Sequence, residues 1–557
     1  MKNIAKLIAL LALVLTSVAA QAQANITLYH MQDLPLNNQL NPAFQPKNGS
    51  IYIAIPAVPF LFAPTSLDVS VTGKNINYSN FLSTTPDYGS IVNGIDKFAV
   101  GQVNFSFSPI SFGFMVKDMY FSLDVNVKTH VEGRVPGDML DLIYYGNGDD
   151  RTLGKRLSME GLGGTAYAYG ELALGFSKEI APLDLTVGGK VKYLQGAGYA
   201  QASLGKNSFI QTNANDYSIT VGLDPELYVA GAPLNVPQGD FTLDSLADSK
   251  TDSYKWNSGN RGVAFDLGGT WNVARVLPQD WAKGMEVSLS LIDLGFINWK
   301  GNKVVKADDA TDFTFEGMEF SSNEEDNENF TDALVDSVMN MAKVQSAGNA
   351  SFRKWLEPTL YFGANYNFGA LNENLKWLNA GALFGCRFGT YENLPLFAAS
   401  VNTENLPVNV SLSGSYFDGK GNLGFGVVFG RRGCQFHIIT DNILAGRYEK
   451  AQSVNLRMGM NVLVGKTREQ RKEKWAAATQ DVMAPGEALN PVQQQGAAGA
   501  TVEGSAPVET RSNTAGDEAA LKQGLKDEKT PGVSAEELIK RAMEEEAAEG
   551  DAVVKQQ

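Results

Sequence analysis

Residues 454–464 read Val454-Asn455-Leu456-Arg457-Met458-Gly459-Met460-Asn461-Val462-Leu463-Val464, an alternation of apolar residues with residues that are mostly polar or small. Successive residues of a β-strand point to opposite faces, so an apolar residue at every second position predicts a strand with one apolar face. The stretch is eleven residues long, whereas strands of soluble proteins usually have about five or six residues. A strand of this length suits a crossing of the lipid bilayer at a tilt.

The same alternation returns along most of the chain before residue 465. The apolar members of the clearest segments are Phe121, Leu123, Val125 and Val127; Leu185, Val187, Val191 and Tyr193; Val263, Phe265, Leu267, Gly269, Trp271 and Val273; Met285, Val287, Leu289 and Leu291; Leu360, Phe362, Ala364 and Tyr366; Val408, Val410, Leu412, Gly414 and Tyr416. Fourteen to sixteen spanning segments of this kind can be counted roughly, within the range known for membrane barrels.

Alternation by itself does not say which face meets lipid, because a soluble β-sandwich also alternates. Segment length favours a membrane barrel, and so do Lys190, Lys192 and Arg457 on the polar faces, which suit a hydrated lumen. Aromatic residues near segment ends are expected to form interfacial girdles; they are Tyr361, Tyr366, Phe368, Tyr416, Phe417, Trp271 and Trp299. We therefore predict an all-β fold, an antiparallel transmembrane β-barrel of about 14 strands. An exported β-sandwich or multi-domain protein stays the alternative.

The connections between segments differ in length. Asp418–Asn422 and Arg431–Gly433 are short enough for hairpins, whereas 133–163, 201–260 and 307–351 are long and polar. Residues 332–344 have the spacing of a short helix. In such barrels the long connections face outside and the short ones face the periplasm.

The first residues predict export. Lys2 and Lys6 precede the apolar run Leu7–Val18, and Ala20-Gln21-Ala22 offers a signal-peptidase site. The run is too short for a comfortable membrane span, which needs about 20 residues, so residues 1–22 are expected to be a signal peptide; an N-terminal anchor is the alternative. Residues after it contain no apolar run of 18, so a membrane location would require a closed barrel.

Composition narrows the function classes. The net charge of −15 argues against a nucleic-acid partner. The three histidines, His30, His130 and His437, are far apart, and no cofactor or metal motif is present. Gly459 and Gly465-Lys466-Thr467 resemble a phosphate-binding loop, but five residues separate the glycines where that motif has four. We expect a protein that is not an enzyme. Cys386 and Cys434 lie on separate segments and are expected to stay unpaired.

The alternation stops at Lys466. Residues 467–474 are charged and favour a helix. Residues 480–530 have a composition typical of disordered segments. Ser534–Glu537 form a capping-box pattern, which predicts a short acidic helix after it. We expect residues 466–557 to be a periplasmic low-complexity tail with short helices. The tail is interpreted either as a tether for a protein partner or as a solvated segment.

Several short motifs carry a family resemblance. They are Leu28–Pro35 followed by Asn38–Phe44, and then Gly189–Leu194, Val263–Gly269 and Ser290–Trp299. In this order they resemble a family of uncharacterised Bacteroidetes outer-membrane barrels (DUF5723-like), which is related to the FadL-type transporters. The motifs span most of residues 28–465 and leave the tail uncovered.

The resemblance implies a fourteen-stranded barrel whose N-terminal segment folds inside as a hatch containing Asn41, Pro42, Ala43 and Phe44. Pro35, Pro42 and Pro46 cannot donate ladder hydrogen bonds, which makes this stretch a poor central strand. An exposed N-terminal loop is the alternative. We expect residues 23–64 to hold the hatch and first strand, and residues 65–465 to form the barrel.

The main functional hypothesis is a barrel in the outer membrane of a Gram-negative bacterium, exported by the general secretory route. It would contact membrane lipid and admit a hydrophobic or amphipathic small molecule through a plugged lumen, which requires an apolar pocket near residues 28–64. The alternative is a structural or secretion-accessory barrel that binds protein partners through its loops and periplasmic tail. A hydrolase using His130 or His437 is the third hypothesis.

Overall fold

The structure is a computed structural model that describes most of the chain up to residue 473. The described residues are 26–54, 66–74, 88–95, 97–231, 239–240, 259–275, 277, 279–306, 313–315, 344–389, 393–417, 420–443 and 453–473. Among them, no helix is both long and apolar enough to cross a membrane.

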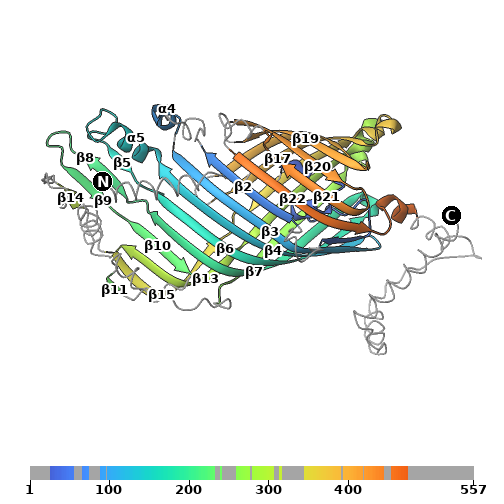
Figure 1. The fold of residues 1–557 in the computed structure, drawn as a ribbon, viewed down its shortest axis with the longest axis horizontal. Helices are drawn as coiled ribbons and strands as arrows, with labels where there is room; N and C mark the ends of the chain where they lie inside the picture. The colour runs from blue at the N-terminus through green and yellow to red at the C-terminus, as the bar shows by residue number, and fades with distance from the viewer. Residues whose placement is uncertain are drawn as a thin grey trace, which may run out of the picture. The chain divides into compact units, whose positions relative to one another are not determined.

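One large antiparallel sheet contains most of the strands (Figure 1). Its strands are β1 (Ile51–Ala54), β2 (Ser66–Lys74), β3 (Phe98–Val116), β4 (Met119–Pro136), β6 (Gly163–Ile180), β7 (Leu185–Leu204), β10 (Pro225–Ala230), β11 (Gly239–Asp240), β12 (Arg261–Asn272), β13 (Met285–Lys306), β15 (Val344–Trp355), β16 (Thr359–Asn367), β17 (Leu378–Phe388), β18 (Asn393–Thr403), β19 (Val408–Phe417), β20 (Lys420–Phe429), β21 (Gly433–Thr440) and β22 (Ser453–Val464).

Smaller elements lie outside this sheet. A second sheet holds β5 (Arg156–Ser158), β8 (Phe209–Thr212), β9 (Ile219–Gly222) and β14 (Phe313–Phe315). The short helices are α2 (Ile26–Tyr29), η1 (Pro35–Gln39), α4 (Tyr88–Asn93), α5 (Gly137–Tyr145), η2 (Ala181–Leu183), η3 (Val273–Arg275), η4 (Asp280–Gly284), η5 (Phe368–Ala370) and η6 (Glu373–Leu375).

The large sheet closes on itself as a 14-strand barrel. Three positions of the ring hold two strands end to end: β1 with β2, β10 with β12, and β15 with β16. The two-residue β11 pairs only with β15 and is not counted as a separate strand of the ring. The ring closes where β22 pairs with both β1 and β2, which pair in turn with β3. This confirms the predicted antiparallel transmembrane barrel of about 14 strands.

The two faces of the barrel wall differ as the alternation predicts. In β22, Asn455, Arg457 and Asn461 are only 3–6% exposed and face the interior. Leu456 and Val462, on the other face of the same strand, are 39% and 41% exposed. The apolar face therefore points outward, which is the arrangement of a membrane barrel rather than of a sandwich.

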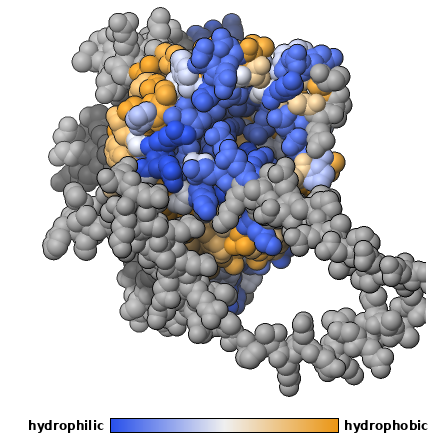
Figure 2. Space-filling model, turned by 90° about the vertical axis from the view of Figure 1, so that its right-hand side faces the viewer, coloured by the Kyte–Doolittle hydropathy of each residue, from blue (hydrophilic) through white to orange (hydrophobic). Residues whose placement is uncertain are grey.

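The longest connections lie at one end of the barrel, although the short connections from β17 to β18 and from β19 to β20 lie at that end as well. Short connections join β3 to β4, β6 to β7, β18 to β19 and β20 to β21, at the end where β22 stops. Long segments join β4 to β6, β7 to β10, and β13 to β15 at the other end. Figure 2 views the end at which β22 stops, where hydrophilic residues fill the centre and hydrophobic ones lie at the flanks.

Several sequence predictions need correction. The strands extend farther than the predicted loop bounds, because β4 continues to Pro136, β7 to Leu204, and β15 already begins at Val344. The prediction that Trp299 and Tyr361 belong to the interfacial girdles is wrong, because both side chains are 1% exposed and point inward. Trp299 shares its phase with the buried Ile297, and a residue's phase along a strand, not its nearness to an end, decides its face. Tyr416 is 57% exposed, as a girdle residue should be.

Other predictions concern parts of the chain outside the description. These are the signal peptide, the helix predicted within 332–344 (apart from Val344, which is in β15) and the tail beyond residue 473. Cys386 and Cys434 are both free thiols, as expected.

Candidate functional site

Residues 26–50, called here the luminal segment, lie inside the ring of strands. Their side chains and backbone bond to inward-facing residues of six barrel strands: Thr27 to Ser413 of β19, Tyr29 to Ser288 and Leu40 to Ser290 of β13, Asn38 to Ser122 of β4, Gln45 to Ser177 of β6, Asn41 to Gly269 of β12, and Gln39 to Arg457 of β22. Contacts to strands all round the ring place the segment within the lumen.

The luminal segment is packed as a core. Leu28 and Leu34 have no exposed surface, and they join a cluster with inward-facing wall residues such as Tyr361, Leu383 and Ile439. Tyr29 meets Phe44 edge-on, with ring centroids 5.2 Å apart. The apolar side chains of the segment thus fill the space beside the wall, as buried residues in protein interiors do.

The residues predicted for a hatch lie inside this packing. Asn41 and Ala43 are 0% and 2% exposed, and Phe44 is 7% exposed. A Cβ atom on Gly268 of β12 would overlap Asn41, and one on Gly188 of β7 would overlap the backbone of Pro42. The wall therefore has no side chain at these two places, where the segment comes close to it.

Buried polar groups anchor the segment at the end of the barrel where β22 stops. Asp33 accepts hydrogen bonds from the Asn48 and Asn409 side chains, at 2.6 and 2.7 Å, and from the backbone amide of Asn405 at 2.7 Å. Burial raises the pKa of Asp33 to about 6. Burial also lowers the pKa of His30 to about 4, so its imidazole is neutral at pH 7.

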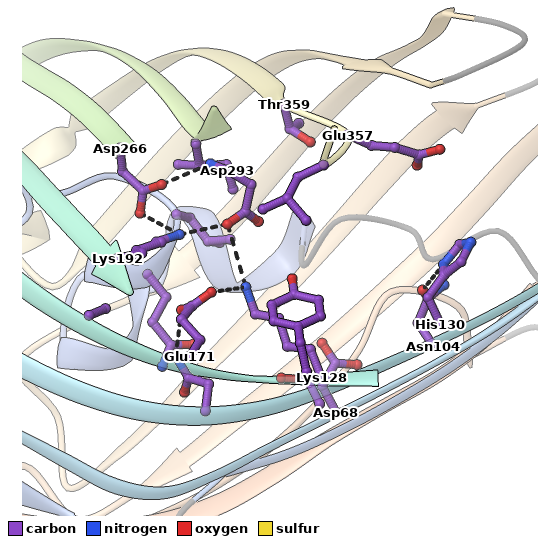
Figure 3. Close-up of a pocket in the computed structure, with 18 of the residues that line it drawn as sticks. Asp68, Asn104, Lys128, His130, Glu171, Lys192, Asp266, Asp293, Glu357 and Thr359 are labelled. Atoms are coloured by element: carbon purple, nitrogen blue, oxygen red, sulfur yellow. Dashed lines mark hydrogen bonds and ion pairs between the residues drawn. The ribbon is translucent and has the colours of Figure 1, made fainter. Parts of the chain in front are cut away.

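A cavity of about 190 Å³, called here the inner cavity, is lined on one side by Gln39 and Leu40 of the luminal segment. A network of charges lines it (Figure 3). Lys192 Nζ lies 2.7 Å from a carboxylate oxygen of Asp266 and 2.7 Å from one of Asp293. Lys128 Nζ lies 2.9 Å from Glu171 and 3.5 Å from the same Asp293 oxygen. Buried charges are tolerated when they are paired and hydrogen-bonded in this way.

Asp293 owes its position to an irregularity in β13. The pairing of β13 with β12 shifts register between Phe265 and Leu267, as in a β-bulge, and Asp293 lies there at φ 58°. Its backbone amide donates to Asp266 over 2.8 Å. Bulges re-aim side chains, and this one turns the Asp293 carboxylate toward the two lysines.

Next to the bulge at Asp293, the neighbouring strand of the wall is interrupted between β15 and β16. β13 pairs with β16 up to Ile292 and with β15 from Phe296 onward, so Leu356, Glu357 and Pro358 connect β15 to β16 without ladder partners of their own. A backbone hydrogen bond holds this connection on each side: Leu356 N donates to Gly295 O of β13, and Phe388 N of β17 donates to Pro358 O, both at 2.9 Å.

A second cavity of about 580 Å³, the outer cavity, lies at this break. His130, Tyr167, Leu356 and Glu357 line both cavities. Leu294, Trp355 and Phe388 also line the outer cavity, and they are 42%, 64% and 41% exposed. The outer cavity thus extends from the charged interior to apolar side chains of the wall.

The histidines predicted for a hydrolase do not come together. His130 pairs its Nδ1 with Asn104 at 2.7 Å and faces the cavities, whereas His437 is 1% exposed on β21 and lines neither. Within the described part of the chain, no group of three or more His, Cys, Asp or Glu residues is placed to hold a metal ion.

Sequence reasoning found part of this site. Lys190, Lys192 and Arg457 were predicted to face the lumen, and all three do, at 3–4% exposure. It missed the group formed by Lys128, Glu171, Asp266 and Asp293. The available signal was a charged residue on the polar faces of three strands, Lys128, Glu171 and Asp266. Asp293 falls in the phase of the apolar Leu289 and Leu291, and only the bulge turns it inward.

Comparisons with known proteins give one family and several structures. The model of the family described as "Family of unknown function (DUF5723)" matches residues 42–441. No curated protein matches the sequence.

Two of three similar solved structures are channels by their titles. A deletion mutant of the monoaromatic hydrocarbon channel TodX is 9% identical, with TM-score 0.36, covering 80% of this chain and 94% of that one. A Pseudomonas aeruginosa FadL homologue is 11% identical, with TM-score 0.33 and coverage of 75% and 90%. The monoaromatic hydrocarbon channel CymD is 7% identical, with TM-score 0.34 and coverage of 80% and 95%.

Proposed function

The chain belongs to the DUF5723 family of unknown function, and we propose that it is an outer-membrane barrel that admits an amphipathic small molecule into its lumen. The observation that carries this proposal is the continuity of the two cavities through His130, Tyr167, Leu356 and Glu357. The proposed export by the general secretory route agrees with such a location.

The two cavities differ in chemistry, and the difference defines the ligand. The inner cavity presents carboxylates, ammonium groups and hydroxyls, which suit a polar or charged group. The outer cavity also has charged side chains, but it adds Tyr199, Trp355, Leu294 and Phe388, which suit a hydrocarbon or ring portion. Its charged lining residues, besides Glu357, are Glu132, Arg134, Glu226, Arg353 and Lys354. A molecule with one polar and one apolar end would satisfy both, whereas a pure hydrocarbon would desolvate the charges without replacing their hydrogen bonds.

The break between β15 and β16 gives the apolar portion a route. Trp355 and Leu294 face outward at the level where the outer cavity meets the wall. We propose that the ligand passes between the membrane and the lumen at Leu356–Pro358, where single backbone hydrogen bonds of Leu356 and Pro358 stand in place of continuous ladder pairing.

The luminal segment is proposed to close the passage as a hatch, with Asn41, Pro42, Ala43 and Phe44 in its packed part. Its support is the dense packing of residues 26–44 against the wall. Around residues 28–44, the segment's own side chains fill the space where an apolar pocket is predicted, and the space beside them is the mixed inner cavity bounded by Leu40. This favours an amphipathic ligand over a purely hydrophobic one.

Binding of a fluorescent amphiphile tests the proposal. The full-length barrel in detergent is titrated with dansyl-undecanoic acid, and we expect saturable binding that Thr165→Trp, which fills the outer cavity, weakens about tenfold. Leu174→Trp is the matched control, because Leu174 is 56% exposed on the outer face and lines neither cavity. Saturable binding that is equal in all three proteins, or no binding to the wild type, contradicts the proposal.

A further inference from the structure

The residues that follow the last strand return to the exit of the luminal segment. Thr467 begins a short helix over residues 468–473. The backbone amide of Thr467 donates to the Gln470 side chain at 3.1 Å, and the amide of Gln470 donates to Thr467 Oγ1 at 3.3 Å. This reciprocal pair is a capping box, which fixes where the helix starts.

Arg471 of this helix binds the backbone of the luminal segment. Its Nη2 donates to the carbonyl of Pro46 at 2.9 Å, and its Nη1 donates to Gly49 at 2.6 Å and to Lys466 at 2.8 Å. The planar guanidinium presents several donors in one plane, which allows it to join three carbonyls at once. Burial lowers the pKa of Arg471 to about 10, so the group stays charged at neutral pH.

Backbone contacts extend the same junction. The amide of Arg468 donates to the carbonyl of Lys47 at 2.7 Å, and Ser50 Oγ donates to the carbonyl of Lys466 at 2.9 Å. The residues from Lys466 to Arg471 therefore cover the segment exactly where it leaves the lumen and becomes β1.

The helix is also tied to the barrel wall. Glu179, near the end of β6, lies 3.2 Å from Arg468 and 2.6 Å from Lys472. The Glu179 side chain is 12% exposed, and burial of a paired carboxylate strengthens the attraction relative to a surface pair. Lys47 of the luminal segment is held separately by Glu404, at 3.0 Å.

From these contacts we propose that residues 466–473 are a latch that holds the luminal segment where it joins β1. Displacing the helix removes the charged donor from three carbonyls of residues 46, 49 and 466 at once. The luminal segment then keeps its contacts inside the lumen but loses the hydrogen bonds that hold Pro46 and Gly49 next to β1. The inference rests on the proposed role of the luminal segment as a hatch.

Labelling of a buried cysteine tests the latch without using transport. In the full-length chain with Cys386→Ser and Cys434→Ser, Ala43→Cys places one thiol in the segment, at a site that is 2% exposed. We expect Arg471→Gln to raise the rate of maleimide labelling about tenfold, and Arg471→Lys, which keeps the charge but not the planar donors, to give an intermediate rate.

Lys283→Gln is the matched control, because it removes an exposed ion pair, with Asp280, that lies outside the latch. Its labelling rate should stay near that of the parent. Heat-dependent gel migration shows that each barrel is closed. A closed Arg471→Gln barrel that labels at the parent rate overturns the latch. If the wild type does not bind the amphiphile but Arg471→Gln still labels faster than the parent, the result contradicts the proposed function and leaves the latch standing.

Discussion

The carboxylate of Asp441, just after β21, accepts a hydrogen bond of 2.8 Å from the backbone amide of Thr27, 414 residues earlier in the chain. Its other oxygen accepts from the amide of Ile26 at 3.2 Å, and Asn455 donates to the same oxygen at 2.7 Å. Asp441 thus binds the first described turn of the luminal segment, while Arg471 binds the other end of the segment at Gly49.

Replacing Asp441 by Asn should loosen this first turn. Hydrogen bonds to a charged group contribute about 1.5–3 kcal/mol each, so we expect much faster amide exchange at Ile26 and Thr27. Hydrogen–deuterium exchange of the peptide that contains both residues measures this. Asp280→Asn serves as the control, because Asp280 is exposed and pairs only with Lys283 in its own turn. Unchanged exchange in Asp441→Asn would show that packing alone holds the segment.

Asp33 should make stability depend on pH. Because burial raises its pKa from 3.8 to about 6, the folded state binds the proton more tightly than the unfolded state. Its contribution is then fully present below pH 3.8 and is lost as the pH rises through 6, by about 3 kcal/mol at most. His30, whose pKa is lowered to about 4, acts in the opposite direction between pH 6.5 and 4.

Comparison with Asp33→Asn separates the two effects. The melting temperature of the wild-type barrel in detergent, minus that of Asp33→Asn, should rise as the pH falls from 7 to 4. His30 is present in both proteins, so its contribution cancels. A difference that stays flat over this range would place the pKa of Asp33 near its ordinary value.

Lys192→Met should be strongly destabilising. It leaves the buried Asp266 and the partly exposed Asp293 with one cation fewer, and breaking a buried ion pair from one side costs about 3–5 kcal/mol. Lys178→Met is the matched control, because Lys178 is 50% exposed and lies 3.9 Å from Asp118, a surface pair of about 0–1 kcal/mol. Urea unfolding in lipid vesicles compares them, and equal midpoints would contradict a structural role for the network.

A side chain at position 268 should unseat the luminal segment without opening the barrel. Gly268→Val puts methyl groups where Asn41 now lies, whereas Gly414→Val, at a glycine with no atom within 4 Å of its missing Cβ, should be tolerated. Maleimide labelling of Ala43→Cys reports the segment, and heat-dependent gel migration reports the barrel. Slow labelling in Gly268→Val would mean that the segment accommodates the added volume.

The period of two and the length of the segments were enough to predict an antiparallel barrel of about 14 strands and its polar interior. The prediction for Trp299 and Tyr361 failed because it used nearness to a strand end, while the phase of each residue put both side chains inside. The extra residue of the bulge at Asp293 could not be predicted, since a bulge changes register by one residue without changing the composition of the strand.

By itself, the sequence determined which residues share a face, because side-chain direction in a strand depends only on position along it. Only the tertiary structure decided which charges meet: Lys128 and Lys192, on β4 and β7, share Asp293 because the closed ring brings their inward faces together. The same closure decided that residues 26–50 lie within the lumen and that Arg471 reaches Pro46 and Gly49. These contacts join residues far apart in the chain, and no local pattern encodes such distances.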